Sequence, residues 1–88
     1  MNKTVNAYAE GKMMDIPLYT IGEKTYALFF SKAFNGFSGF EVANNGKRLC
    51  AIDYGYISRR GADWVDACGT KVAEPELAAA LNAAQKTL

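Results

Sequence analysis

The side chains that most often perform chemistry in proteins are few in this chain. Its 88 residues include no histidine, which removes the commonest general base and metal ligand and excludes Ser-His and Cys-His nucleophile systems. Three carboxylates, Asp53, Asp63 and Asp66, lie close together in the sequence. Divalent cations need several oxygen ligands that converge in one loop, and the spacing of an EF-hand is absent. We therefore expect solvated acids at turns and strand ends, with no metal site and no catalytic residues.

Neither the glycines nor the cysteines form a pattern that indicates a cofactor. The chain lacks the G-x-G-x-x-G and Walker A patterns, and Gly36, Gly39 and Gly46 fit turns and close strand packing. Cys50 and Cys68 are too few for a disulfide framework and lack the spacing of metal ligands. We expect no cofactor, and we interpret both cysteines as small buried apolar side chains in a reducing compartment.

The length and charge of the chain favour a small soluble protein. The opening segment lacks the apolar core of a signal peptide, and no apolar run approaches the roughly 20 residues that span a bilayer. The formal net charge of +1 gives no electrostatic case for DNA wrapping or for binding an anionic membrane. We expect a cytoplasmic protein in which residues 1–88 form one domain, with one small core and no deep cleft.

Basic and aromatic side chains are the strongest candidates for a binding surface. Arginine, tryptophan and tyrosine dominate the hot spots of protein interfaces, and arginines beside aromatic rings on a sheet also bind nucleic acids. The acids at 53, 63 and 66 reduce the positive field, and the RNP-type aromatic motif is absent. The protein-binding set is Arg59, Arg60, Trp64, Tyr56, Phe34 and Phe37, and the alternative nucleic-acid-binding set is Arg59, Arg60, Lys47 and Arg48.

Regularly spaced turn signals divide the first part of the chain into strands. Asn35-Gly36 and Asn45-Gly46 readily adopt the positive φ of a type I′ turn, the strongest short-range signal for a β-hairpin. The intervening runs are rich in aromatic and β-branched residues, as strands are. An antiparallel meander is therefore predicted from strands at residues 4–9, 16–21, 25–34, 37–43 and 47–54.

The segment that follows has two interpretations. One is a hairpin of residues 56–59 and 64–68 that turns at Arg60-Gly61, and this is the one we prefer. The other is a short helix over residues 62–68, which would place Trp64 above Cys68 and end at Gly69.

The last residues predict an amphipathic helix. Pro75 suits a first helical turn, and Glu74 and Glu76 suit its positive end. Polar side chains fall on one side of this segment, at Asn82 and Gln85 among others. The apolar side chains that share the opposite face are Leu77, Ala80, Leu81, Ala84 and Leu88.

A two-residue turn at Asn35-Gly36 would place Phe34 opposite Phe37 across the central hairpin. The same register pairs Ser31 with Phe40, Phe30 with Glu41 and Phe29 with Val42. Because side chains alternate along a strand, one face carries Phe29, Ser31, Ala33, Phe40 and Val42, and the other carries Tyr26, Leu28, Phe30, Lys32, Phe34, Phe37 and Glu41.

Both faces of the predicted sheet are apolar, but one alanine-rich helix covers only one of them. The second face needs another cover, which could be a curling of the sheet, the N-terminal segment, a second copy of the chain or a partner. The predicted fold is thus α+β: an antiparallel meander of five or six strands with a C-terminal helix on one face.

These features favour a non-enzymatic module that binds a protein partner or itself and inhibits by steric occlusion. Inhibitors from phages and mobile elements, including anti-CRISPR and anti-restriction proteins, are similar in size and composition, and the analogy goes no further. The alternative is a nucleic-acid-binding protein. An enzyme would need a partner subunit to complete its site.

Overall fold

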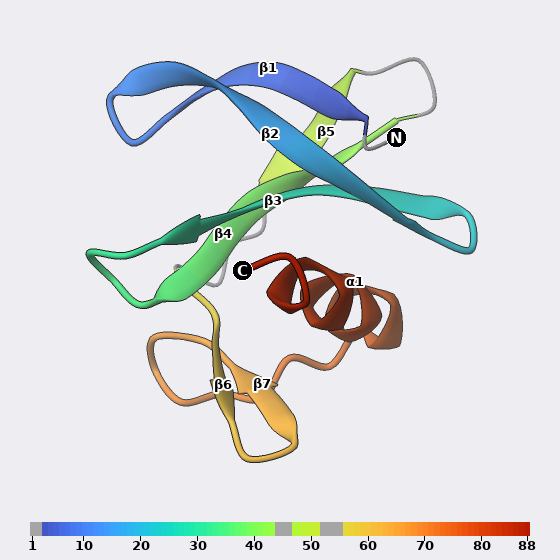
Figure 1. Cartoon of the computed structure of the whole chain (residues 1–88). Helices are drawn as coiled ribbons and strands as arrows, with labels where there is room; N and C mark the ends of the chain where they lie inside the picture. The colour runs from blue at the N-terminus through green and yellow to red at the C-terminus, as the bar shows by residue number, and fades with distance from the viewer. Residues whose placement is uncertain (1–2, 44–46, 52–55) are drawn as a thin grey trace.

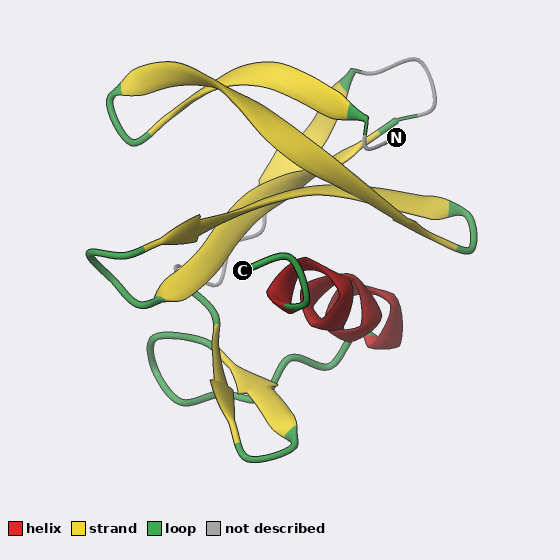
Figure 2. Ribbon diagram, viewed as in Figure 1, coloured by secondary structure: helices red, strands yellow, loops and turns green. Residues whose placement is uncertain are grey.

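The chain folds into a five-stranded antiparallel sheet, a separate two-stranded hairpin and one helix (Figures 1 and 2). The computed structural model describes residues 3–43, 47–51 and 56–88, and for residues 48–51 only the backbone. This architecture confirms the predicted α+β meander with a C-terminal helix. The elements are β1 (Thr4–Ala9), β2 (Lys12–Ile21), β3 (Lys24–Ser31), β4 (Gly36–Val42), β5 (Arg48–Ala51), β6 (Ser58–Arg60), β7 (Asp63–Val65) and α1 (Pro75–Gln85).

The long strand β2 changes partners along its length and so curls the sheet. Residues 12–17 pair with β1, whereas pairing with β3 begins at Leu18, opposite Ala27. Pro17 stands at this change, and proline has no N–H to donate to a ladder. The β1–β2 half consequently crosses one face of the central strands (Figure 1). There Ile16, which is fully buried, packs with Ala27, Phe40 and Val42.

The opposite face is covered by α1 and the β6–β7 hairpin. A second apolar cluster joins these elements to the central strands. Both apolar faces are therefore covered by the chain itself, and the curled sheet that includes the N-terminal segment is the arrangement found. The buried members of this cluster are Tyr26, Leu28, Phe37, Ile57, Trp64, Val72, Leu77, Ala80, Leu81 and Ala84.

The predicted register of the central hairpin is wrong by four residues, although the predicted faces are right. Phe30, and not Phe34, lies opposite Phe37, and Ser31 lies opposite Gly36. A slip by an even number of residues keeps every side chain on its own face. Phe29 and Phe40 therefore share one cluster, and Tyr26 and Leu28 the other, as predicted.

The register differs because Gly36 belongs to a strand and not to the turn. Only Asn35 of the Asn-Gly pair has a positive φ, of 51°. A Cβ on Gly36 would lie 2.9 Å from the carbonyl oxygen of Ile57. Phe37 and Ile57 exchange two backbone hydrogen bonds, of 2.7 and 2.8 Å. Glycine thus permits a close approach by the chain twenty residues later, and Phe34 moves into the loop, where 63% of it is exposed.

The C-terminal elements agree with the preferred interpretation, with shifted ends. Residues 58–65 form the hairpin, and it turns one residue later than predicted, at Gly61-Ala62. In α1 the four predicted residues Leu77, Ala80, Leu81 and Ala84 are buried. Leu88 was wrongly placed on this face, because the helix ends at Gln85 and Leu88 is 70% exposed.

Cys68 is exposed, which corrects its assignment to the core. It lies in a tight turn in which Asp66 Oδ1 accepts hydrogen bonds from the backbone N–H groups of Cys68 and Thr70, at 2.9 and 2.8 Å. The predicted turn at residues 44–46, together with Asp53 and Tyr54, lies outside the described residues, as do the side chains of Cys50 and Arg48. Over the described ranges, no helix has the length and apolarity needed to cross a bilayer.

Gly39 is expected to be the glycine least tolerant of a side chain. A Cβ there would overlap the carbonyl oxygen of Ala27 and lie 2.9 Å from its carbonyl carbon, both of them backbone atoms of the paired strand. We expect Gly39→Ala to lower the free energy of unfolding by about 3 kcal/mol or more, the upper part of the overpacking range. Urea unfolding followed by the fluorescence of Trp64, the single tryptophan, measures the change.

Gly22→Ala is the matched control. Gly22 has a φ of +61°, but open space surrounds its missing Cβ. This variant therefore bears only the cost of left-handed backbone, about 1–2 kcal/mol. Equal losses in the two variants would contradict the close approach of β4 to β3 at Gly39.

Candidate functional site

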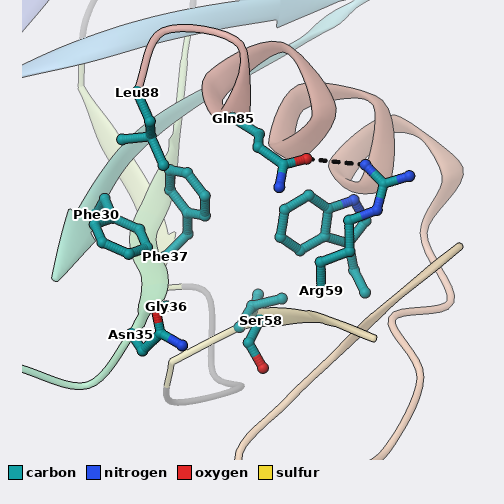
Figure 3. Close-up of a pocket in the computed structure, with 10 residues that line it drawn as sticks. Phe30, Asn35, Gly36, Phe37, Ser58, Arg59, Gln85 and Leu88 are labelled. Atoms are coloured by element: carbon teal, nitrogen blue, oxygen red, sulfur yellow. Dashed lines mark hydrogen bonds between the residues drawn. The ribbon is translucent and has the colours of Figure 1, made fainter. Parts of the chain in front are cut away.

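A surface pocket of about 190 Å³ opens between the β3–β4 loop, strand β6 and the end of α1. Three separate parts of the chain meet at this pocket. They are the β3–β4 loop and the two elements that cover this face of the sheet, α1 and the β6–β7 hairpin. Figure 3 shows Phe30, Phe37 and Leu88 on one side of the pocket and Arg59 with Gln85 on the other. One side of the pocket is therefore apolar, and the other carries a charge.

The floor of the pocket is a chain of aromatic rings. Phe30 and Phe37 meet edge to face, with ring centroids 5.2 Å apart, and Phe37 meets Trp64 in the same way at 5.9 Å. Edge-to-face contact suits the charge distribution of aromatic rings and adds about 0.5–1.5 kcal/mol per pair beyond the buried area. Phe37 and Trp64 are each only 4% exposed. The floor is thus a fixed part of the core.

Arg59 is held at the edge of this floor by neutral groups. Its Nε donates to the carbonyl oxygen of Gly61 at 3.0 Å, and Nη1 donates to Gln85 Oε1 at 2.9 Å and to Asn82 Oδ1 at 3.4 Å. The guanidinium carbon lies 5.8 Å from the ring centroid of Trp64, within the range of a cation–π interaction. Arg59 forms no ion pair with any carboxylate that the structure describes.

Asn82 connects the arginine to the core. Its Oδ1 also accepts a hydrogen bond of 2.9 Å from the indole Nε1 of Trp64. One helix side chain therefore orients both the buried ring and the guanidinium above it. Asn82 and Gln85 are three residues apart on α1, a spacing that places them side by side on one helix face.

Two further aromatic rings lie beside the pocket. Phe34 and Tyr56 stack face to face, with centroids 4.3 Å apart and planes 9° apart. Their chain neighbours Asn35 and Ile57 line the pocket, so the two rings adjoin it. Phe34 is mostly exposed and Tyr56 is half-buried, so this stack offers an accessible aromatic surface.

The structure brings together five of the six residues predicted for protein binding, in roles that differ from the prediction. Phe37 and Trp64 are buried, so they form a floor and cannot project from the surface. Arg59 borders the same pocket. Arg60 is exposed, but side chains alternate along β6, so it points away from Arg59. The prediction missed Ser58, Asn82 and Gln85, although the three-residue spacing of the last two places them on one face of the helix.

The basic residues of the alternative set are divided. Lys47 and Arg48 lie at the end of β4 where Val42 pairs with β5, whereas β6 follows Ile57, which pairs with Phe37 at the other end. Val42 and Phe37 are five residue steps apart on β4, a distance of about 17 Å. These basic residues were grouped in one predicted set, but strand β4 separates them in the structure.

The predicted carboxylates also have structural roles where they are described. Asp63 forms an exposed ion pair with Lys71, with a distance of 3.3 Å, and Asp66 stabilises the turn around Cys68. The described residues contain no group of acids and cysteines placed to hold a metal ion.

Asn82→Ala is expected to lower the free energy of unfolding by about 1 kcal/mol, because it removes the acceptor of a buried indole N–H. Gln85→Ala is the matched control, since Gln85 contacts Arg59 in an exposed hydrogen bond, and its loss should stay within about 0.5 kcal/mol. Chemical denaturation of both variants gives the comparison. Equal stability of the two would contradict the role of Asn82 as the acceptor for the Trp64 indole N–H.

We found no match to this chain among models of protein families, curated proteins or solved structures.

Proposed function

We propose that this chain is a non-enzymatic module that binds a protein partner through the side chains around the pocket. The rim face comprises Phe34, Tyr56, Ser58, Arg59 and Gln85. The observation that carries the proposal is the placement of Arg59, which is held over Trp64 by neutral acceptors beside the Phe34–Tyr56 stack. Arginine and aromatic side chains of this kind supply most of the binding energy in protein interfaces.

The size of the pocket supports a protein partner over a metabolite. Pockets for small molecules measure about 300–1,000 Å³, and this pocket is smaller, at about 190 Å³. It has room for one inserted side chain, while the flat aromatic stack beside it extends the contact area. Among the described lining residues Arg59 is the only charged side chain, so a pair of groups for acid–base catalysis is not assembled there.

Preorganisation supports binding by a rigid face. The arginine has three hydrogen bonds to the protein, and the rings beneath it are packed in the core. Side chains that are already ordered lose less conformational entropy on association. The mechanism we propose is steric occlusion, in which this small domain covers a surface of its partner and inhibits it without chemistry.

Arg59→Ala and Tyr56→Ala are expected to weaken the partner complex about 30-fold each, the effect of removing a hot-spot side chain worth about 2 kcal/mol. Tagged chains are used to recover partners from a lysate of the source cells. A protein recovered with the unchanged chain and depleted with both variants is then titrated against each of them by calorimetry.

The control for this experiment is the double variant Tyr8→Ser, Met13→Ser. Tyr8 and Met13 lie opposite each other on β1 and β2 and are 65% and 59% exposed, far along the chain from the rim face. Binding should survive in this control. Loss of the partner in the control, with retention in the two rim variants, would place the interface on the N-terminal hairpin and contradict the proposal.

A nucleic-acid-binding function makes a different prediction. Its affinity would fall steeply with salt and disappear in the double variant Arg59→Ala, Arg60→Ala. Because β4 separates the backbone positions of these basic residues, we expect no saturable binding of single-stranded DNA or RNA oligonucleotides, measured by fluorescence anisotropy at low salt. Saturable binding that depends on both arginines would favour nucleic acid over a protein partner.

A further inference from the structure

We propose that the pocket selects a partner segment in which an acidic residue adjoins an apolar one. This inference rests on the proposed function and specifies the partner's chemistry. The apolar side chain would enter the pocket against Phe30 and Phe37, and the neighbouring Asp or Glu would pair with Arg59 at the rim.

The charge of Arg59 points to an acidic residue. A guanidinium group has five N–H donors, of which Nε and Nη1 contact Gly61, Asn82 and Gln85. These acceptors are all neutral, and Nη2 has no hydrogen-bond partner among the described residues. The positive charge is therefore oriented by the protein but not neutralised by a described carboxylate. A carboxylate from a partner would pair with this exposed guanidinium through a charge-assisted hydrogen bond.

The opposite wall points to an apolar residue beside the acid. Leu88, which is mostly exposed, lies on this side of the pocket with Phe30 and Phe37 (Figure 3). Contact with an incoming apolar side chain would remove the exposed parts of Leu88 and Phe30 from water, since Phe37 is already buried, and each Å² removed stabilises the complex by about 25 cal/mol. The volume of about 190 Å³ limits the insertion to one side chain. The acid then has to come from an adjacent residue of the same segment.

A single oriented guanidinium suits one carboxylate better than a phosphate backbone. Binding to a nucleic acid draws on several cations that neutralise successive phosphates. Arg60 points away from Arg59 on β6, and Lys47 lies at the far end of β4. The rim face therefore presents one positive group next to an apolar pocket, which matches an acidic–apolar pair of residues.

The test compares two dipeptides that differ only in charge. N-acetyl-Leu-Asp-amide and N-acetyl-Leu-Asn-amide are titrated into the ¹⁵N-labelled chain, and the indole N–H of Trp64 reports binding because the chain has one tryptophan. We expect the acidic dipeptide to shift the Trp64 and Arg59 Nε–H resonances saturably. The amide dipeptide should bind about two- to fivefold more weakly, because it loses a charge-assisted hydrogen bond to an exposed guanidinium.

Two variants test the role of the charge independently. Arg59→Gln should remove the difference between the two dipeptides. Gln85→Glu places a carboxylate where Nη1 now donates, so it should pair with Arg59 within the protein and weaken binding of the acidic dipeptide about two- to fivefold, with little effect on the amide. The spectrum of each variant in the absence of peptide shows whether it is folded, and either variant alone suffices for the comparison.

Several outcomes would overturn the inference. The first is equal affinity for the two dipeptides. The second is the absence of a Trp64 shift at about 20 mM peptide, near the weakest binding that such a titration detects. The third is an equal shift produced by acetate or inorganic phosphate alone. If the partner complex still depends on Arg59 and Tyr56 in that case, the proposed function stands and only the acidic–apolar specificity falls. If the dipeptides behave as expected but the rim variants recover the partner as well as the unchanged chain does, the proposed function is wrong instead.

Discussion

The structure depends on one constraint: the central β3–β4 hairpin is apolar on both faces. Ala27 and Phe40 point to one side, and Leu28 and Phe37 to the other. Each face has to be covered, since leaving a leucine or phenylalanine side chain exposed costs about 1.5–3 kcal/mol. The rest of the chain divides accordingly, with the β1–β2 half on one face and α1 with the β6–β7 hairpin on the other (Figure 1).

The pocket is a consequence of this second covering layer. The helix and the small hairpin reach the same end of β4 from different directions, and they leave a gap above Phe37. Backbone pairing between Phe37 and Ile57 brings β6 close to the gap, and Asn82 joins the helix to Trp64. The elements that stabilise the core therefore also orient Arg59 at its surface, which connects the stability of the fold to the proposed recognition of a partner.

Much of the fold could be predicted because it depends on local chemistry. Alternation identified the two faces of the central hairpin, and Pro75 with the apolar spacing after it identified α1. The site was predicted only in part. Arg59 and Trp64 were chosen by residue type, but the burial of Trp64 and the roles of Asn82 and Gln85 depend on contacts between residues at least 18 positions apart.

The sequence by itself determined which side chains share a face, because the alternation of a strand survives a slip of two or four residues. It also indicated most of the elements, through turn residues, β-branched and aromatic runs and helix spacing, but it left residues 56–68 open between a hairpin and a short helix. Only the tertiary structure decided the register of the central hairpin and the membership of the pocket. The physical reason lies at Gly36. The close approach of Ile57, a distant part of the chain, requires a glycine there, whereas the local Asn-Gly pair predicts that this glycine belongs to a turn.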